Sequence, residues 1–246
     1  GGPLPVFLGP FIRGFMRITK HFGIDVLELG DPNPKVTIVM LHGFGADFQD
    51  LAALSEEITT LPKNTQWLFP NGVLQIALGP GMMGRAWFPL DARELEQAML
   101  SGKPKDYSKT LPSGLHPVSD RMAEFLRSLV KPDHRLIVGG FSQGAMVACD
   151  AVLTHKVPVH SLLLLSGALV AEQRWTEALR AWPERTELRV FQSHGEQDPL
   201  LDFHCAEQLR DLLEREGVFV DFHGFRGQHE IPRAVLQKLG QFLKGT

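Results

Sequence analysis

Short apolar runs alternate along the chain with stretches in which apolar residues recur every three or four positions. The short runs predict strands, and several are apolar without interruption, as expected for strands that are covered on both faces. Two of them flank Gly23 and predict a hairpin. The predicted strands are residues 16–22, 24–30, 35–43, 65–70, 135–141, 161–167, 188–195 and 218–224.

The amphipathic stretches predict helices. Ser119 is expected to cap one of them, Gly217 to close another and Pro232 to open the last. The predicted helices are residues 47–58, 119–130, 143–153, 203–216 and 232–243. Strands that alternate with helices predict an α/β fold with a mostly parallel central sheet and helices on both faces. In such sheets the reactive groups lie beyond the carboxyl ends of the strands.

Residues 71–117 resist this scheme, because they are rich in Gly, Pro and Met and have little periodicity. A connection of this length within a compact domain is usually functional or mobile. We interpret it as a long substrate-side loop region whose residues Met82, Met83, Trp87 and Phe88 wall an apolar pocket. The alternative is that these side chains only fill a local core beneath the loop.

The composition excludes several classes of protein. With 43% apolar residues, 22% charged residues and a net charge of −3, it shows no bias toward nucleic acid or an anionic membrane. No apolar run reaches the roughly 18–20 residues that span a bilayer. Two cysteines, Cys149 and Cys205, fit buried free thiols in a reducing compartment, so we expect a cytoplasmic protein. We expect one domain over residues 1–246, beginning with an apolar extension at 1–20 that lacks the basic start of a signal peptide.

Residues 140–144, GFSQG, form a G-x-S-x-G pattern between a predicted strand and a predicted helix. This context predicts a nucleophile elbow, a tight strand-to-helix turn that lifts the hydroxyl of Ser142 out of the sheet. The glycines at 140 and 144 let neighbouring backbone approach where a Cβ would clash. The start of the following helix favours negative charge beside the serine.

Two further pieces follow in the chain order that a serine triad of this kind requires. Asp198 comes after a predicted strand and before Pro199, where an acid can orient a histidine. Glu196 and Asp202 are the rivals for this role. His229 lies between the last predicted strand and the last predicted helix, where it can reach the serine as a general base.

His223 is the rival base, but it lies at the end of the strand itself, with little loop to carry it to the serine. The loop LHGFGAD at 41–47 follows an early predicted strand, where this arrangement places one oxyanion donor. We expect the N–H groups of Phe44 and Gln143 to be the two donors. His42 is expected to brace this loop rather than to take part in the reaction.

Together, LHGFGAD, GGFSQGAM, HGEQDPL and QHEIP resemble the phospholipase/carboxylesterase family of α/β-hydrolases, which includes acyl-protein thioesterases and small bacterial carboxylesterases. The resemblance runs from about residue 36 to the end of the chain. It implies an α/β-hydrolase fold without a large separate cap. It also implies that AWFPL, with Trp87, matches the tryptophan-bearing loop beside the acyl site of the family. Residues 1–20 and the long stretch 93–115 depart from the family pattern.

The resemblance implies a serine hydrolase that cleaves carboxylic esters through an acyl-enzyme on Ser142, without a cofactor or a metal. Thioesterase and lysophospholipase specificities are the alternatives among enzymes. A catalytically silent α/β-hydrolase that serves as a ligand receptor is the alternative outside enzymes, and the intact Ser, Asp and His argue against it. The expected partner is a small-molecule ester or thioester, not nucleic acid, and a homodimer is left open.

Overall fold

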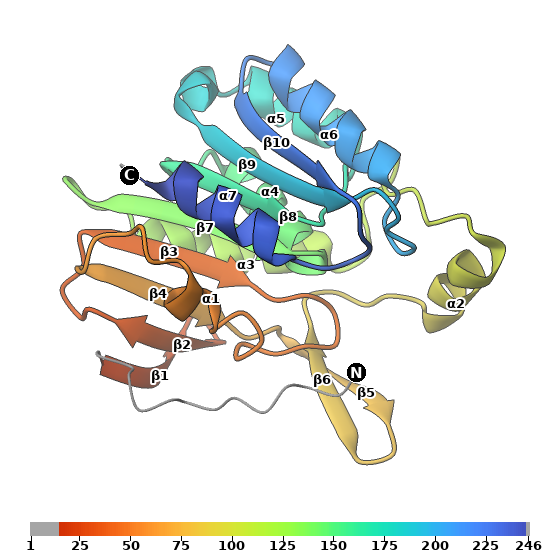
Figure 1. Cartoon of the computed structure of the whole chain (residues 1–246), viewed down its shortest axis with the longest axis horizontal. Coiled ribbons are helices and arrows are strands. Elements are labelled where there is room, and N and C mark those ends of the chain that lie inside the picture. The colour runs from red at the N-terminus through yellow and green to blue at the C-terminus, as the bar shows by residue number, and fades with distance from the viewer. Residues whose placement is uncertain (1–14, 245–246) are drawn as a thin grey trace.

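The computed structural model describes residues 15–244, which fold around a central sheet of eight strands (Figure 1). The strand order is β1-β2-β4-β3-β7-β8-β9-β10. The strands are β1 (Phe15–His21), β2 (Ile24–Gly30), β3 (Val36–Leu41), β4 (Thr65–Pro70), β7 (Arg135–Phe141), β8 (Ser161–Leu165), β9 (Arg189–Gly195) and β10 (Phe219–Phe225). All eight predicted strands are therefore confirmed. Neighbours from β4 to β10 are parallel, whereas β1 and β2 add an antiparallel edge.

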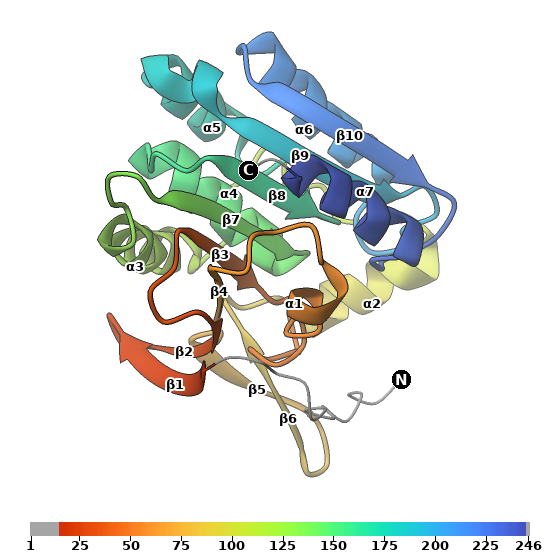
Figure 2. The same ribbon diagram turned by 60° about the vertical axis from the view of Figure 1, so that its left-hand side comes forward.

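Helices cover both faces of the sheet (Figure 2). One face carries α3 (Leu115–Ser128), α4 (Gln143–His155), α5 (Glu172–Arg180) and α6 (Phe203–Arg215). The other carries α1 (Leu54–Glu57) and α7 (Arg233–Leu243). The short 3₁₀ helix η1 (Pro183–Glu187) leads into β9.

The central strands alternate between these two cores, because successive side chains of a strand point to opposite faces. In β7, Val138 packs in the core beneath α4, whereas Ile137 packs in the core beneath α7. Both side chains are fully buried. The uninterrupted apolar runs of the sequence therefore reflect strands that are covered on both faces.

Two helices differ from the sequence prediction at their starts. Residues 48–53 form turns, and only α1 is helical, because Asp47 Oδ1 accepts the N–H of Gln49 and competes with helical bonding. The helix predicted at 119–130 begins earlier, at Leu115, after Gly114 with a φ of 86°. Pro117 is tolerated there because it lies in the first turn. Ser119 is therefore inside α3, buried, and does not cap it.

Residues 71–117 contain more regular structure than their composition indicates. A hairpin of β5 (Leu74–Gly79) and β6 (Met82–Ala86) extends from the molecule, and α2 (Ala92–Ser101) follows it (Figure 1). Asp91 caps α2 by accepting the N–H of Arg93, and Gly102 ends it with a φ of 66°. Residues 1–14 of the expected apolar extension lie outside the described residues, and its remainder lies in β1.

Candidate active site

Ser142 stands in a sharp turn between β7 and α4. Its φ of 57° and ψ of −120° are unusual for a residue with a Cβ, and such strain is found mainly at functional sites. Its N–H donates to Leu165 O at 2.9 Å, which ties the turn to the carboxyl end of β8. The expected elbow geometry is therefore present.

Gly140 and Gly144, the two glycines of the G-x-S-x-G pattern, allow close backbone packing. A Cβ on Gly140 would lie 2.4 Å from the carbonyl carbon of Gly144. A Cβ on Gly144 would lie 2.1 Å from Leu41 O and 2.4 Å from His42 O. Only glycine lets α4 start this close to the end of β3, and this places Ser142 beside the loop that follows β3.

Two short hydrogen bonds join the three side chains singled out in the sequence. His229 Nδ1 lies 2.7 Å from Asp198 Oδ2, and His229 Nε2 lies 2.8 Å from Ser142 Oγ. Because a carboxylate only accepts, the imidazole carries its proton on Nδ1, and its bare Nε2 accepts the serine O–H. This arrangement can move a proton from the hydroxyl to the imidazole.

Asp198 is held from both sides. Its Oδ1 accepts the N–H groups of Leu200 and Leu201, both at 2.9 Å, while Oδ2 faces His229. Burial alone would raise the pKa of the Asp198 carboxyl. The hydrogen bond and charge of His229 and the two amide donors outweigh burial, so that its pKa is lowered. The carboxylate is therefore ionised at neutral pH.

Backbone pairing between two loops brings His229 to Asp198. Glu196 N donates to Phe225 O at 2.8 Å, and Gln197 N donates to Gly227 O at 2.9 Å. Gly195 permits this contact, because a Cβ there would lie 2.1 Å from Gln228 O. The loops after β9 and β10 are thus joined along the approach to the serine.

The rival residues lie elsewhere. Glu196 is exposed, and Asp202 caps α6 by accepting the N–H of His204. His223 Nε2 lies 2.9 Å from Asp221, and its ring stacks on Phe191 with the centroids 5.1 Å apart. None of the three makes a hydrogen bond or an ion pair with Ser142 or His229 in the described part of the chain.

The loop after β3 lies against the elbow. A Cβ on Gly43 would be 3.4 Å from Ser142 Cβ. Within residues 15–244, neither the Phe44 N–H nor the Gln143 N–H donates to a backbone acceptor. Both expected donors are thus available close to the serine, and that of Gln143 also lies at the N-terminus of α4, where negative charge is favoured.

His42 braces this loop in a neutral state. Its Nδ1 donates to Gly43 O at 2.7 Å, and its Nε2 accepts the N–H of Gly72 at 2.9 Å. Burial lowers the pKa of His42 to about 4, although the Gly43 carbonyl and the charge of Asp47 oppose the shift. A protonated ring would lose the bond from Gly72, so the brace requires the neutral form.

We expect this histidine to make the fold sensitive to acid. Its pKa is about 4 in the folded chain and 6.5 when unperturbed, so between these values the unfolded chain binds the extra proton and stability falls as pH falls. From pH 7 to 4.5, the free energy of unfolding of the wild type should drop by about 2–3 kcal/mol more than that of His42→Asn. Urea unfolding across this range measures the difference, and parallel pH curves would contradict it.

The four residues expected beside the acyl group occupy two environments. Trp87 and Phe88 are 1% and 0% exposed and belong to the core on the α4 side of the sheet. Met82 and Met83, on β6, are 49% and 56% exposed. Trp87 and Phe88 therefore fill a core as well as lying near the site, whereas the two methionines offer free apolar surface.

Gln143 links these parts through its buried side chain, a role that the sequence analysis missed. Its Oε1 accepts the N–H of Trp87 at 2.7 Å, and its Nε2 donates to Phe88 O at 2.8 Å. Trp87 Nε1 in turn donates to His42 O at 2.8 Å. The available signal was an amide side chain at the first position of an otherwise apolar, buried helix. The segment after β6 is thus fixed to both the elbow and the loop after β3.

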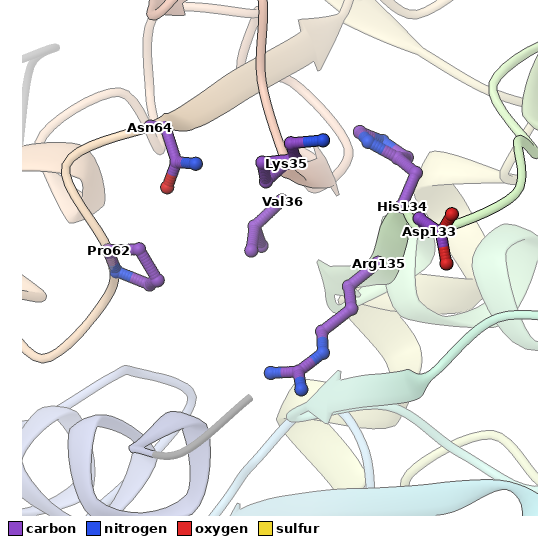
Figure 3. Close-up of a pocket in the computed structure, with 7 residues that line it drawn as sticks. All are labelled: Lys35, Val36, Pro62, Asn64, Asp133, His134 and Arg135. Atoms are coloured by element: carbon purple, nitrogen blue, oxygen red, sulfur yellow. The ribbon is translucent and has the colours of Figure 1, made fainter.

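A separate hollow of about 540 Å³ opens at the opposite edge of the sheet (Figure 3). It is lined by residues at the amino ends of β3 and β7 and before β4, among them Lys35, Asn64 and Arg135. Because the elbow follows the carboxyl end of β7, this hollow is not part of the candidate site. In the part of the chain that the structure describes, no group of three His, Cys, Asp or Glu side chains could hold a metal ion. No helix within residues 15–244 is long and apolar enough to cross a membrane.

Comparison with known proteins gives consistent matches. The model of the phospholipase/carboxylesterase family matches residues 23–246, somewhat more of the chain than the sequence motifs indicated. Acyl-protein thioesterase 1 of Mycosarcoma maydis is 30% identical over 226 residues, which cover 86% of this chain and 91% of that protein.

Solved structures share the fold. A carboxylesterase from Mesorhizobium loti superposes with a TM-score of 0.71 at 19% identity, covering 94% of this chain and 99% of that one. Zea mays acyl-protein thioesterase 2 superposes with a TM-score of 0.67 at 22% identity, covering 94% and 97%. The expected α/β-hydrolase fold is thus confirmed, and residues 15–244 include no separate cap domain.

Proposed function

Because the chain belongs to the phospholipase/carboxylesterase family of α/β-hydrolases, we propose that it is a serine hydrolase that cleaves carboxylic esters through an acyl-enzyme on Ser142. The observation that carries this proposal is the unbroken line of hydrogen bonds from Ser142 through His229 to Asp198, at 2.8 and 2.7 Å. The strained turn at Ser142 supports it, because strain of this kind presents the hydroxyl above the sheet.

In the proposed mechanism, Ser142 Oγ attacks the acyl carbonyl while His229 Nε2 takes the hydroxyl proton. Asp198 keeps the imidazole proton on Nδ1 and stabilises the imidazolium that forms. The negative charge of Asp198, buried and held by two amides, lies 2.7 Å from the ring that becomes positive. The imidazolium then gives its proton to the departing alkoxide oxygen, which leaves as the alcohol, and water cleaves the acyl-enzyme by the same steps.

The oxyanion that forms during each step needs donors placed in advance. We assign this role to the N–H groups of Phe44, in the loop that lies against the elbow, and of Gln143, the residue after the serine. One such donor typically lowers the barrier by about 3 kcal/mol. His42, Trp87 and the Gln143 side chain support this role by fixing the backbone that carries the two donors.

For the acyl group we propose the β5–β6 hairpin as the apolar surface. Gly45 N donates to Arg85 O, and Arg85 N donates to Ala46 O, both at 2.7 Å, so β6 is joined to the oxyanion loop. Met82 and Met83 supply exposed apolar surface there, and a thioether adapts to varied chains. Trp87 and Phe88 support the same wall from the core.

A thioesterase specificity is the second candidate, because the relative from Mycosarcoma maydis is named an acyl-protein thioesterase. The same nucleophile and base serve both reactions. A thiolate is a better leaving group than an alkoxide, so thioester cleavage depends less on proton donation by His229.

A chain-length series tests the acyl surface together with the function. Wild-type protein should hydrolyse p-nitrophenyl acetate, butyrate, octanoate and palmitate, with kcat/KM rising several-fold per two carbons until the surface ends. Met83→Ser should flatten this rise, because it removes apolar surface from β6. Palmitoyl-CoA and a lysophospholipid in the same assay rank the thioesterase and lysophospholipase alternatives.

Met99→Ser is the matched control, because Met99 on α2 is 57% exposed against 56% for Met83. It should leave the chain-length profile unchanged. An unchanged profile in Met83→Ser would reject the hairpin surface. Absence of turnover on every ester and thioester would reject the hydrolase itself.

A further inference from the structure

A second histidine lies against the acid of the proposed triad. His194 is near the end of β9, and its side chain is fully buried. Its Nε2 lies 2.7 Å from Leu201 O and 3.4 Å from Asp198 Oδ2, the oxygen that faces His229. The loop that carries Asp198 therefore folds back over this ring.

The ring of His194 has one possible tautomer. A carbonyl only accepts, so Nε2 must carry the proton that is donated to Leu201 O. Nδ1 is buried and has no partner among the described residues. Burial lowers the pKa of His194, although the Leu201 carbonyl and the charge of Asp198 oppose the shift. The ring is thus a neutral donor directed at the Leu201 carbonyl.

We propose that His194 is a positioning residue for Asp198: the Nε2–H that it donates to Leu201 O holds the loop that directs the Asp198 carboxylate at His229. The proposal rests on the assignment of Asp198 as the triad acid. His194 is then a fourth side chain, besides Ser142, Asp198 and His229, that determines the position of the His229 imidazole.

The hydrogen bonds explain why a fourth residue is needed. Leu200 and Leu201 fix Asp198 Oδ1 through their N–H groups, so the direction of the carboxylate depends on where the backbone of these two residues is held. His194 holds Leu201 through its carbonyl while Leu201 holds Asp198 through its amide. The donor therefore restrains the loop on which Asp198 stands, and the ring itself packs 3.4 Å from Oδ2.

Neutrality matters for the reaction. The charged and titratable groups that face His194 are Asp198, Asp202 and His229. A cation 3.4 Å from Oδ2 would compete with the imidazolium of His229 for the same carboxylate. A neutral His194 ring holds the loop of Asp198 and leaves the negative charge of the carboxylate to stabilise the imidazolium of His229. The Phe203 ring, with its centroid 6.2 Å from that of His194, helps keep the site apolar.

Two substitutions of nearly equal volume separate positioning from packing. Glutamine places an N–H close to the position of Nε2, whereas methionine fills the same space without a donor. We expect His194→Met to lower kcat by about tenfold to a hundredfold with KM within about twofold, the effect of a misplaced catalytic group. His194→Gln should stay within about threefold of the wild type in kcat. If His194 only packed, both substitutions would lower the melting temperature and change kcat to a similar extent.

Asparagine provides a further test that does not depend on the folding of the methionine variant. Its amide is too short to reach Leu201 O, so His194→Asn should lose kcat as His194→Met does. In His194→Met and His194→Asn, but not in His194→Gln, the NMR resonance of the His229 Nδ1 proton should shift and broaden. Equal kcat in the glutamine variant and in the methionine and asparagine variants, or an unchanged resonance in the latter two, would overturn the proposal.

The resonance is measured without substrate, so it reports on positioning even if the protein hydrolyses none of the esters. The proposed function has its own readout, the loss of activity in Ser142→Ala. Failure of one is therefore distinguishable from failure of the other.

Discussion

Ser142→Ala should lower kcat for p-nitrophenyl butyrate by about 10⁴-fold or more, while the melting temperature stays close to that of the wild type. The alanine variant loses the nucleophile and its bond to His229. It keeps the backbone, because a methyl group at φ 57° meets the same strain as the serine Cβ. Initial rates and differential scanning calorimetry measure the two quantities on the same preparation.

Ser166→Ala is the matched control. Ser166 is a buried serine that follows β8 and also has a positive φ, 50°, but its Oγ is directed at Glu230 O at 3.4 Å. We expect its kcat to remain within a few-fold of the wild type. If Ser142→Ala kept more than about a tenth of the wild-type kcat, Ser142 would not be the nucleophile.

His229→Ala should be about as damaging as Ser142→Ala, and the double variant should be little worse than either single one. The reason is that the serine hydroxyl is a poor nucleophile unless Nε2 removes its proton, so the two side chains act as one unit. Loss of the imidazole also leaves the Asp198 carboxylate without its partner at 2.7 Å. Steady-state kinetics on the three variants give the coupling between the two sites.

His223→Ala is the comparison for this prediction, because His223 contacts Asp221 and Phe191 instead of the triad. It should retain most of the wild-type kcat. Independent, additive losses in the Ser142 and His229 variants, or a larger loss in His223→Ala than in His229→Ala, would reassign the base.

The parts of the fold that are covered on both sides were predictable from the sequence. Strands β7 and β8 are apolar at nearly every position because both faces lie in a core, and this pattern is local. The elbow was predictable for a similar reason. Its glycines, its serine and the two flanking elements are contiguous in the chain, and the acid and base follow in a fixed order.

The sequence did not predict α2 and α5 because both helices are largely exposed. A helix shows a regular spacing of apolar residues only where one of its faces is buried. Only Ala98 is buried in α2, and α5 buries a single i, i+4 pair, Trp175 and Leu179, so each helix offers too few apolar positions for the period to be recognised. The caps of α2, Asp91 and Gly102, were visible in the sequence but were read as part of a loop.

Side-chain contacts between distant segments could not be predicted at all. The bond from Trp87 Nε1 to His42 O joins residues 45 positions apart, and it depends on how the segment after β6 packs on the elbow. Trp87 was expected in the substrate wall, whereas its side chain is 1% exposed and also fills the core. His194 likewise approaches Asp198 only because the loop after β9 folds back on the strand.

The most direct test of the proposed acyl-enzyme is to trap the nucleophile. The wild-type protein is mixed with an alkyl fluorophosphonate, which phosphonylates activated serines, and the modified peptide is identified by mass spectrometry. The account predicts one phosphonyl group per chain, on Ser142, with loss of esterase activity in proportion to labelling and no label in Ser142→Ala. A label on any other residue that tracks the loss of activity, or full ester turnover by a protein that never labels at Ser142, would contradict it.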